Sequence, residues 1–165
     1  MKRPLVYMSR CFGFEKCRYD AETVTDEFIE SLKSKVDVIH ECPETAIGLG
    51  CPRSPIRIVR KYGAPVLFQP ETGLYFTEKM TEFAKNYAEK LANVDAFILK
   101  AKSPSCGAGN VKYYDFMTGM IINEIHTGFF TAEILKRFPD ALVTDELLLA
   151  IPQERELFLS RLFKD

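Results

Sequence analysis

Short apolar segments alternate along this chain with segments whose apolar residues recur at helical spacing. Four apolar runs predict strands, namely Leu5–Ser9, Val36–His40, Asp95–Lys100 and Ala141–Asp145. Helical periodicity is found between and after them, in residues 23–35, 77–93, 127–138 and 151–163. This alternation predicts an α/β fold with an open, mainly parallel, Rossmann-like sheet in three layers.

The remaining segments contain glycine and proline and predict loops and hairpins. Residues 47–58 predict a long loop ending in a strand through Ile56–Val59, followed by a small hairpin or excursion in 64–73. A second local hairpin is predicted in 111–122. Thr25 is expected to cap the first helix. The last helix is expected to bury Leu157, Phe158, Leu162 and Phe163. With no internal repeat or linker, residues 1–165 are predicted to form one domain.

The composition is that of an ordinary globular protein. The chain has 165 residues, 47% apolar and 27% charged, with a net charge of −1. This balance favours neither nucleic acid nor an anionic membrane as the main partner. Because no signal peptide and no run of bilayer-spanning length is present, we expect a cytoplasmic protein, monomeric or homodimeric.

Three of the five cysteines follow directly after predicted strands. Cys11, Cys42 and Cys106 each lie just beyond the carboxyl end of one strand, where the loops of a parallel sheet converge on a ligand. A single cysteine in a reducing compartment is usually a small buried hydrophobe, and disulfides are not expected there. Three cysteines at one sheet edge instead predict a metal or cluster site.

Three thiolates suit zinc, copper(I) or an iron–sulfur cluster. Zinc sites usually contain C-x2-C pairs or nearby histidines, whereas this chain has no such pair and only His40 and His126. Single cysteines on separate loops favour a cluster, and three ligands on four irons would leave one iron open. Cys17 is the alternative fourth ligand, which would close that position.

Linked motifs around these cysteines resemble those of a known family. "SRCFGFEKCRYDAE", "ECPETAIGLGCPRSPIRIV" and "LKAKSPSCG" resemble the family's S-x-C-L-L-G…RYDG, C-P-E…PxPR and K-x-S-P-S-C-G motifs. The family is the former domain-of-unknown-function family that includes the 2-thiouracil desulfidases. The resemblance extends from about Leu5 to Pro139. Phe12 and Ala21 depart from the usual leucine and glycine, which bears on substrate identity more than on cluster binding.

The resemblance implies a 4Fe–4S cluster held by Cys11, Cys42 and Cys106, whose open iron takes the sulfur of a thiocarbonyl substrate. It further implies catalytic roles for Glu44 and Ser103. The expected reaction hydrolyses C=S to C=O and releases hydrosulfide. Cys17 and Cys51 are interpreted as bystanders, because the family motifs do not require them.

The residues themselves suit these roles. Glu44, two residues after Cys42, is placed to act as general base for water or as a proton relay, although a helix-capping or ion-paired carboxylate is the simpler interpretation. Ser103 is placed to hydrogen-bond the attacking water, or alternatively to close a turn before proline.

The neighbouring polar residues have weaker signals. Ser105 is expected only to support the loop, and Arg53 either to bind substrate or to support its loop. Lys100 and Lys102 are candidates for binding an anionic part of the substrate.

Two other functions remain open from the sequence. A fourth cysteine ligand would convert the site into a closed cluster or zinc site, typical of a redox or metal sensor without catalysis. A thiolated tRNA substrate is disfavoured by the net charge of −1. The expected partner is therefore a small thiocarbonyl molecule; no membrane partner is expected, and nucleic acid is disfavoured.

Overall fold

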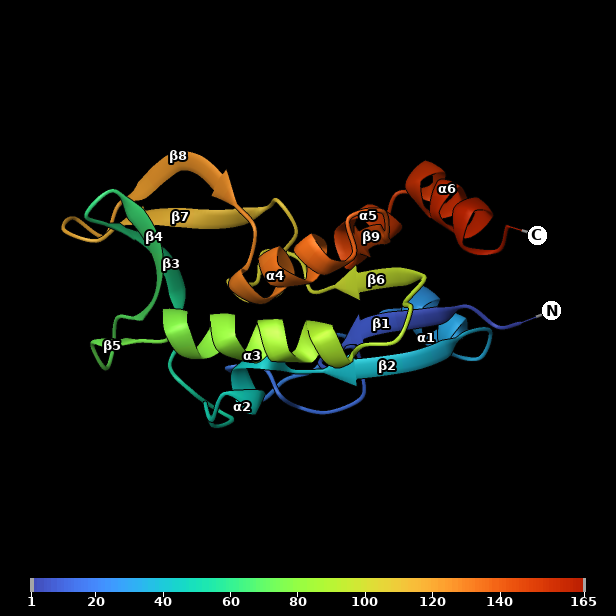
Figure 1. The fold of residues 1–165 in the computed structure, drawn as a ribbon, viewed down its shortest axis with the longest axis horizontal. Helices are drawn as coiled ribbons and strands as arrows, with labels where there is room; N and C mark the ends of the chain where they lie inside the picture. The colour runs from blue at the N-terminus through green and yellow to red at the C-terminus, as the bar shows by residue number, and fades with distance from the viewer. Residues whose placement is uncertain (1, 165) are drawn as a thin grey trace.

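The computed structural model describes residues 2–164. Figure 1 shows the order of its elements along the chain. The strands are β1 (Leu5–Ser9), β2 (Asp37–Glu41), β3 (Arg57–Lys61), β4 (Ala64–Gln69), β5 (Leu74–Tyr75), β6 (Ala96–Leu99), β7 (Val111–Asp115), β8 (Ile121–His126) and β9 (Leu142–Asp145). The helices are α1 (Glu27–Lys33), α2 (Pro43–Ala46), α3 (Thr77–Lys90), α4 (Phe129–Arg137), α5 (Glu146–Leu149) and α6 (Pro152–Leu162).

The first sheet contains the four predicted strands in the order β2–β1–β6–β9, and every pair is parallel. Apolar side chains on both faces are buried, since helices cover both sides. One face packs on α1 and α6 through Met8, Ile98 and Ile29, among others. The opposite face packs on α3 and α4 through Tyr7 and Phe97. The predicted three-layer, mainly parallel α/β fold is thereby confirmed.

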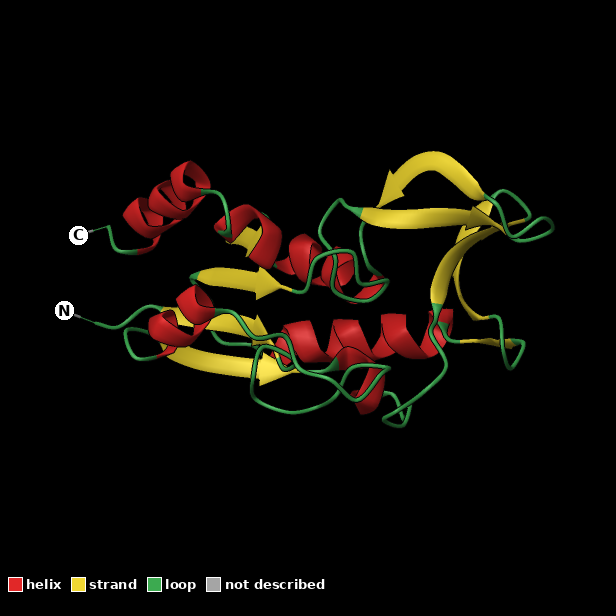
Figure 2. Cartoon of the chain, turned by 180° about the vertical axis from the view of Figure 1, so that it is seen from behind, coloured by secondary structure: helices red, strands yellow, loops and turns green. Residues whose placement is uncertain are grey.

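The second sheet has the order β5–β4–β3–β7–β8. It contains both predicted hairpins, and the parallel pairing of β3 with β7, Ile58 opposite Tyr113, joins them into one sheet. The sequence did not predict this junction. Ile58 and Leu67 on one of its faces belong to the same apolar core as α3 and Phe97. Figures 1 and 2 show this sheet at the end of the molecule opposite to both termini.

Some predicted details of the helices are wrong. The cap of α1 is Asp26, whose side chain accepts from the Ile29 N–H at 2.9 Å, rather than Thr25. In α6, Phe158 and Leu162 are buried as expected, whereas Leu157 and Phe163 are exposed because they lie on the solvent side. The short helix α5 was not predicted.

No helix within the described residues combines the length and the apolar character needed to span a bilayer.

Candidate active site

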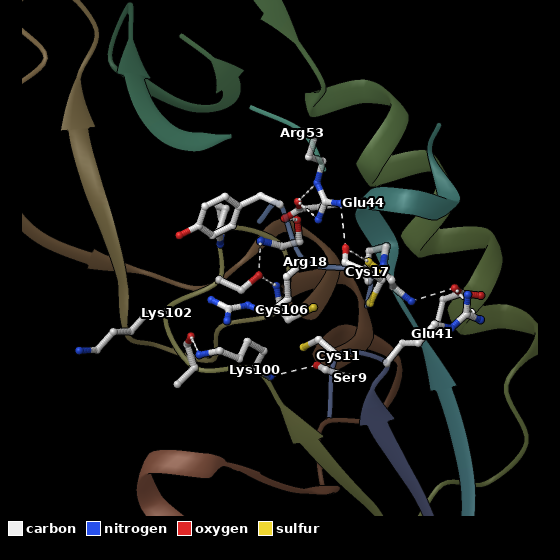
Figure 3. A pocket seen from close by; sticks show the side chains of 18 residues that line it. Ser9, Cys11, Cys17, Arg18, Glu41, Glu44, Arg53, Lys100, Lys102 and Cys106 are labelled. Carbon is white, nitrogen blue, oxygen red and sulfur yellow. Dashed lines mark hydrogen bonds and ion pairs between the residues drawn. The ribbon is translucent and has the colours of Figure 1, made fainter. Parts of the chain in front are cut away.

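A cavity of about 240 Å³ lies at the carboxyl ends of β1, β2 and β6 (Figure 3). Its walls are residues 9–11, 17–19, 41–44, 53 and 100–106. All of these except residue 53 lie at the ends of first-sheet strands or in the segments that directly follow them, as expected for an open parallel sheet. In the described part of the chain, no strand of the second sheet contributes a wall.

The structure brings the three predicted cysteine ligands to this cavity. Cys11 follows β1 by two residues, Cys42 directly follows β2, and Cys106 lies in the loop after β6. Their exposed fractions are 7%, 9% and 6%. In Figure 3 the sulfur atoms of Cys11 and Cys106 point into the same central space. Three separate loops therefore present soft donors to one volume.

The two other cysteines, Cys17 and Cys51, have different surroundings. Cys17 is buried, lines the cavity and packs against Cys11 and Cys42. The Cys42 thiol donates to the Cys17 carbonyl at 3.6 Å. Cys51 is exposed outside the cavity wall, and its thiol donates to the carbonyl of Lys16 at 2.8 Å. Of these two, only Cys17 is close to the predicted ligands.

The surroundings of the cysteine thiols shift their pKa values. Burial raises the pKa of Cys11 to about 12 and raises that of Cys106 well above its usual value. A hydrogen bond between the side chains of Cys17 and Cys42 lowers the pKa of Cys42 to about 6 and raises the pKa of Cys17. Buried thiolates are favourable beside a cation, and a coordinating metal supplies that charge.

The arrangement of donors bears on the kind of metal group. In tetrahedral zinc sites the ligand sulfurs surround one point, about 3.8 Å from one another for Zn–S bonds of about 2.3 Å. Among residues 2–164, no three His, Cys, Asp or Glu side chains converge on a single ion in this way. Thiols from three separate loops around one cavity are soft donors of the kind that iron–sulfur clusters take.

Glu44 lies in the first turn of α2 and is 9% exposed. Both the Nε and the Nη2 atoms of Arg53 contact its Oε2, at 2.7 and 2.6 Å. The Ser105 hydroxyl donates to its Oε1 at 2.9 Å. Oε2 is therefore occupied by both guanidinium nitrogens, whereas Oε1 has one hydrogen bond and keeps a lone pair for a molecule in the cavity.

Arg53 connects three segments around this carboxylate. Besides contacting Glu44, its Nη1 atom donates to the carbonyls of Cys17 and Gly50, at 2.8 and 3.0 Å. The side chain is 6% exposed, so the ion pair is largely out of water. Arg53 thus supports the loop, one of the two roles that the sequence allowed for it.

Ser103 and Ser105 have different surroundings. Ser103 lines the cavity, and its hydroxyl oxygen accepts from the N–H groups of Ser105 and Cys106, at 3.2 and 3.0 Å. Its hydroxyl hydrogen is not used in these bonds. Ser105, expected only to support the loop, is the serine that contacts Glu44. Sequence reasoning underestimated Ser105, because its contact with Glu44 spans 61 positions.

The N-terminus of α4 anchors the loop that carries Cys106. Backbone N–H groups of residues 129–131 donate to the carbonyls of Pro104 and Ser105 at 3.0–3.2 Å. The Thr131 hydroxyl donates to the Cys106 carbonyl at 2.7 Å. These bonds satisfy N–H groups that a helix start otherwise leaves without partners.

Gly128 makes this close approach possible. A Cβ atom at this position would lie 2.4 Å from the carbonyl carbon and oxygen of Ser105 and 2.8 Å from the Cys106 nitrogen. Any other residue would therefore push against the backbone of the loop. Gly128 lies within the helix predicted over residues 127–138, but it directly precedes α4, and a glycine at this position is the sequence signal for the contact.

The two lysines occupy different places. The Lys100 ammonium pairs with the Glu146 carboxylate, whose other oxygen accepts from the Ala101 N–H at 2.8 Å. Lys102 is exposed, and Figure 3 shows its side chain extending away from the cysteines. Lys100 is therefore engaged within the protein. Sequence reasoning missed Glu146, which lies 46 positions from Lys100.

Comparison with known proteins identifies the class of protein that this fold and site define. The family model for 2-thiouracil desulfurase matches residues 6–146, and the chain belongs to this family. The matched range includes every cavity wall described above.

Two individual proteins are similar to this chain. The YbbK protein of Bacillus subtilis (strain 168), described as uncharacterized, is 34% identical over 113 residues, which cover 64% of this chain and 74% of YbbK. The solved structure of TudS, described as a 4Fe–4S-dependent thiouracil desulfidase, superposes with a TM-score of 0.66 at 26% identity. That match covers 97% of this chain and 99% of TudS.

Proposed function

We propose that the protein removes the sulfur of a thiolated pyrimidine such as 2-thiouracil, hydrolysing C=S to C=O and releasing hydrosulfide. The observation that carries this proposal is a single cavity that contains three buried cysteine thiols and the Glu44 carboxylate. Membership of the 2-thiouracil desulfurase family and the likeness to TudS support it.

Cys11, Cys42 and Cys106 would hold a 4Fe–4S cluster as thiolates. The donor set fits such a group because its soft sulfur ligands come from three loops and line one volume. When bound with three thiolate ligands, the cluster supplies an iron that polarises the thiocarbonyl and accepts sulfur. Cys51 is left out of the ligand set because its thiol lies outside the cavity.

Glu44 acts as the general base. Its carboxylate takes a proton from the water that attacks the thiocarbonyl carbon, and returns it to the ring nitrogen or to the departing sulfur. The overall reaction is C=S plus H₂O giving C=O plus H₂S, without net electron transfer. Arg53 and Ser105 hold the carboxylate in one orientation during both transfers.

Ser103 orients the reacting oxygen. Two backbone N–H groups fix its hydroxyl oxygen, which leaves its hydrogen free to donate toward the cavity. A donor placed there stabilises negative charge that develops on the tetrahedral centre.

The substrate in this proposal is a small thiocarbonyl compound. Residues 1–165 act as one domain, whose two sheets share an apolar core. The proposed location of the protein is the cytoplasm.

The test is anaerobic reconstitution with iron and sulfide, followed by measurement of bound iron and released hydrosulfide. Substrates are 2-thiouracil, 4-thiouracil and their ribonucleosides. We expect cluster-dependent hydrosulfide release from at least one of them. Iron binding with no release from any thio-base would overturn the enzymatic proposal.

A non-catalytic sensor is the second candidate, favoured by one observation, the buried Cys17 thiol beside Cys11 and Cys42. Were Cys17 a fourth ligand, no iron would remain open. Cys17→Ala distinguishes the two functions. Retention of iron and of hydrosulfide release supports the desulfidase, whereas loss of the cluster supports a closed site.

A further inference from the structure

The second sheet has one face that no helix within residues 2–164 covers (Figure 1). Strand register places on it Arg57, Val59 and Lys61 of β3, Ala64, Val66 and Phe68 of β4, Tyr75 of β5, Lys112 and Tyr114 of β7, and Ile121 and Ile125 of β8. We call this set the outer face. The opposite face, with Ile58, Leu67 and Tyr113, belongs to the core shared with α3. Figure 1 shows α3 and α4 on one side of this sheet only.

The outer face carries positive charge without negative charge. Its set of residues includes three cations, Arg57, Lys61 and Lys112, and no carboxylate. Within residues 2–164, none of these three cations forms an ion pair, in contrast to Arg53 and Lys100 at the cavity. The net charge of −1 conceals this segregation.

Aromatic rings lie beside these cations. The Lys61 ammonium lies 4.3 Å from the ring centre of Tyr75 and 4.6 Å from that of Phe116. The Arg57 guanidinium lies 4.6 Å from the ring centre of Tyr114. Cations held beside rings in this way neutralise phosphates, while base stacking needs a further ring whose face is exposed.

Tyr62 adds an exposed ring at the edge of this surface. It follows Lys61 in the turn between β3 and β4, has a φ of 50° and is 97% exposed. The Lys61 ammonium lies 5.6 Å from its ring centre. A tyrosine in the left-handed backbone region with no burial gains nothing from packing, whereas an exposed ring is available to stack on a base.

We propose that the outer face binds single-stranded RNA, with phosphates on Arg57, Lys61 and Lys112 and a base stacked on Tyr62. Charge complementarity selects a polyanion, and the rings favour one that carries bases over an acidic peptide. A second copy of this chain is disfavoured, because pairing two outer faces would bring unpaired cations together. This proposal does not depend on the cluster or on catalysis.

The experiment measures fluorescence anisotropy of a labelled single-stranded RNA of about 12 nucleotides, titrated with the protein at several salt concentrations. Three phosphate contacts predict a slope of log K against log salt of about −2. The expected dissociation constant is on the order of 10⁻⁴ to 10⁻⁶ M at physiological salt. An acidic polyglutamate peptide and anionic vesicles serve as competitors.

The variant R57E/K61E/K112E should lose binding and bring the salt slope close to zero. A matched variant, K79E/K85E/K90E, changes the same number of cations on α3 and should bind as the unmodified protein does. Tyr62→Ala should weaken binding at least about 5-fold at every salt concentration while leaving the slope unchanged. Because Tyr62 is almost fully exposed, this substitution spares the fold.

Several results would overturn the proposal. No binding at protein concentrations up to about 1 mM would do so, given the affinity expected of three phosphate contacts. Equal loss in both triple variants would show that only overall charge matters. Competition by polyglutamate or vesicles as effective as by unlabelled RNA would assign the face to another partner. A dimer in sedimentation that the triple variant R57E/K61E/K112E abolishes would assign it to self-association.

Discussion

The two sheets of this protein contribute unequally to the candidate active site. The first sheet is parallel, so the segments after its strands gather at one edge and bring Cys11, Cys42 and Cys106 into one cavity. The second sheet is built from hairpins, whose tight turns lie at both ends, and it contributes no wall to the cavity. Its inner face completes the core instead.

This difference shows how chain topology, rather than residue type, decides where chemistry can be built. Parallel strands need long crossovers, and these crossovers have room for Cys17, Glu44 and Arg53 beside the cysteines. Hairpin connections have only a few residues, such as Tyr62 and Gly63 between β3 and β4, and expose side chains singly. Substitutions in the two regions should therefore have different consequences.

The largest expected effect is that of Cys42→Ser. A proposed ligand is lost while serine remains an acceptable residue at the start of α2. We expect loss of bound iron and of hydrosulfide release to background, measured after anaerobic reconstitution. Cys51→Ser is the matched control and should leave both unchanged. Full iron content in the Cys42 variant would remove this residue from the ligand set.

Glu44→Gln should lower the rate of hydrosulfide release by about 10² to 10⁴, the usual contribution of a general base. The amide preserves the size of the side chain, so iron content should not change. Stopped-time hydrosulfide assays under anaerobic conditions measure the rate, and iron analysis is the control. An unchanged rate would contradict the assigned role of Glu44.

Gly128→Ala tests the attachment of the Cys106 loop to α4. The added methyl meets the Ser105 carbonyl at 2.4 Å, and relief of such overpacking costs about 1–3 kcal/mol. We expect a lower Tm and less iron per chain, measured by thermal unfolding and iron analysis. Gly50→Ala, whose methyl would meet its nearest neighbour at 3.9 Å, is the control. Equal behaviour of the two variants would refute the role of Gly128.

Leu67→Ala should have the smallest effect on catalysis and a clear effect on stability. Leu67 is fully buried on the inner face of the second sheet, and such truncations cost about 2–5 kcal/mol. Urea unfolding should show this loss, while hydrosulfide release per bound cluster stays unchanged at low temperature. A changed rate per cluster would show that the second sheet takes part in catalysis.

Periodicity and strand ends were sufficient to predict the first sheet and the meeting of three cysteines. Buried parallel strands produce continuous apolar runs, and each run is followed directly by its loop. The positions of Cys11, Cys42 and Cys106 just after such runs therefore place all three at the same edge of the sheet. The same reasoning gave both hairpins. It could not join them, because the pairing of Val59 with Tyr114 connects strands more than fifty positions apart.

The partners of Glu44 were harder to predict than Glu44 itself. Arg53 and Ser105 contact it from a loop and from the Cys106 segment, and no periodicity encodes such side-chain pairs. The segregation of Arg57, Lys61 and Lys112 onto one face was hidden for a related reason. Net charge is a sum over the chain, whereas a surface depends on strand register.

The contact of Glu146 with Lys100 and Ala101 makes the far end of the family-matched region part of the site. A chain cut after Asp140 would keep all five cysteines, Glu44 and Ser103. It would lose β9, which pairs with β6, and the carboxylate that holds the segment leading to Cys106. A chain can therefore contain every reactive residue and still fail to form the site. Whether a shortened homologue forms this site is better predicted from whether it retains this carboxylate.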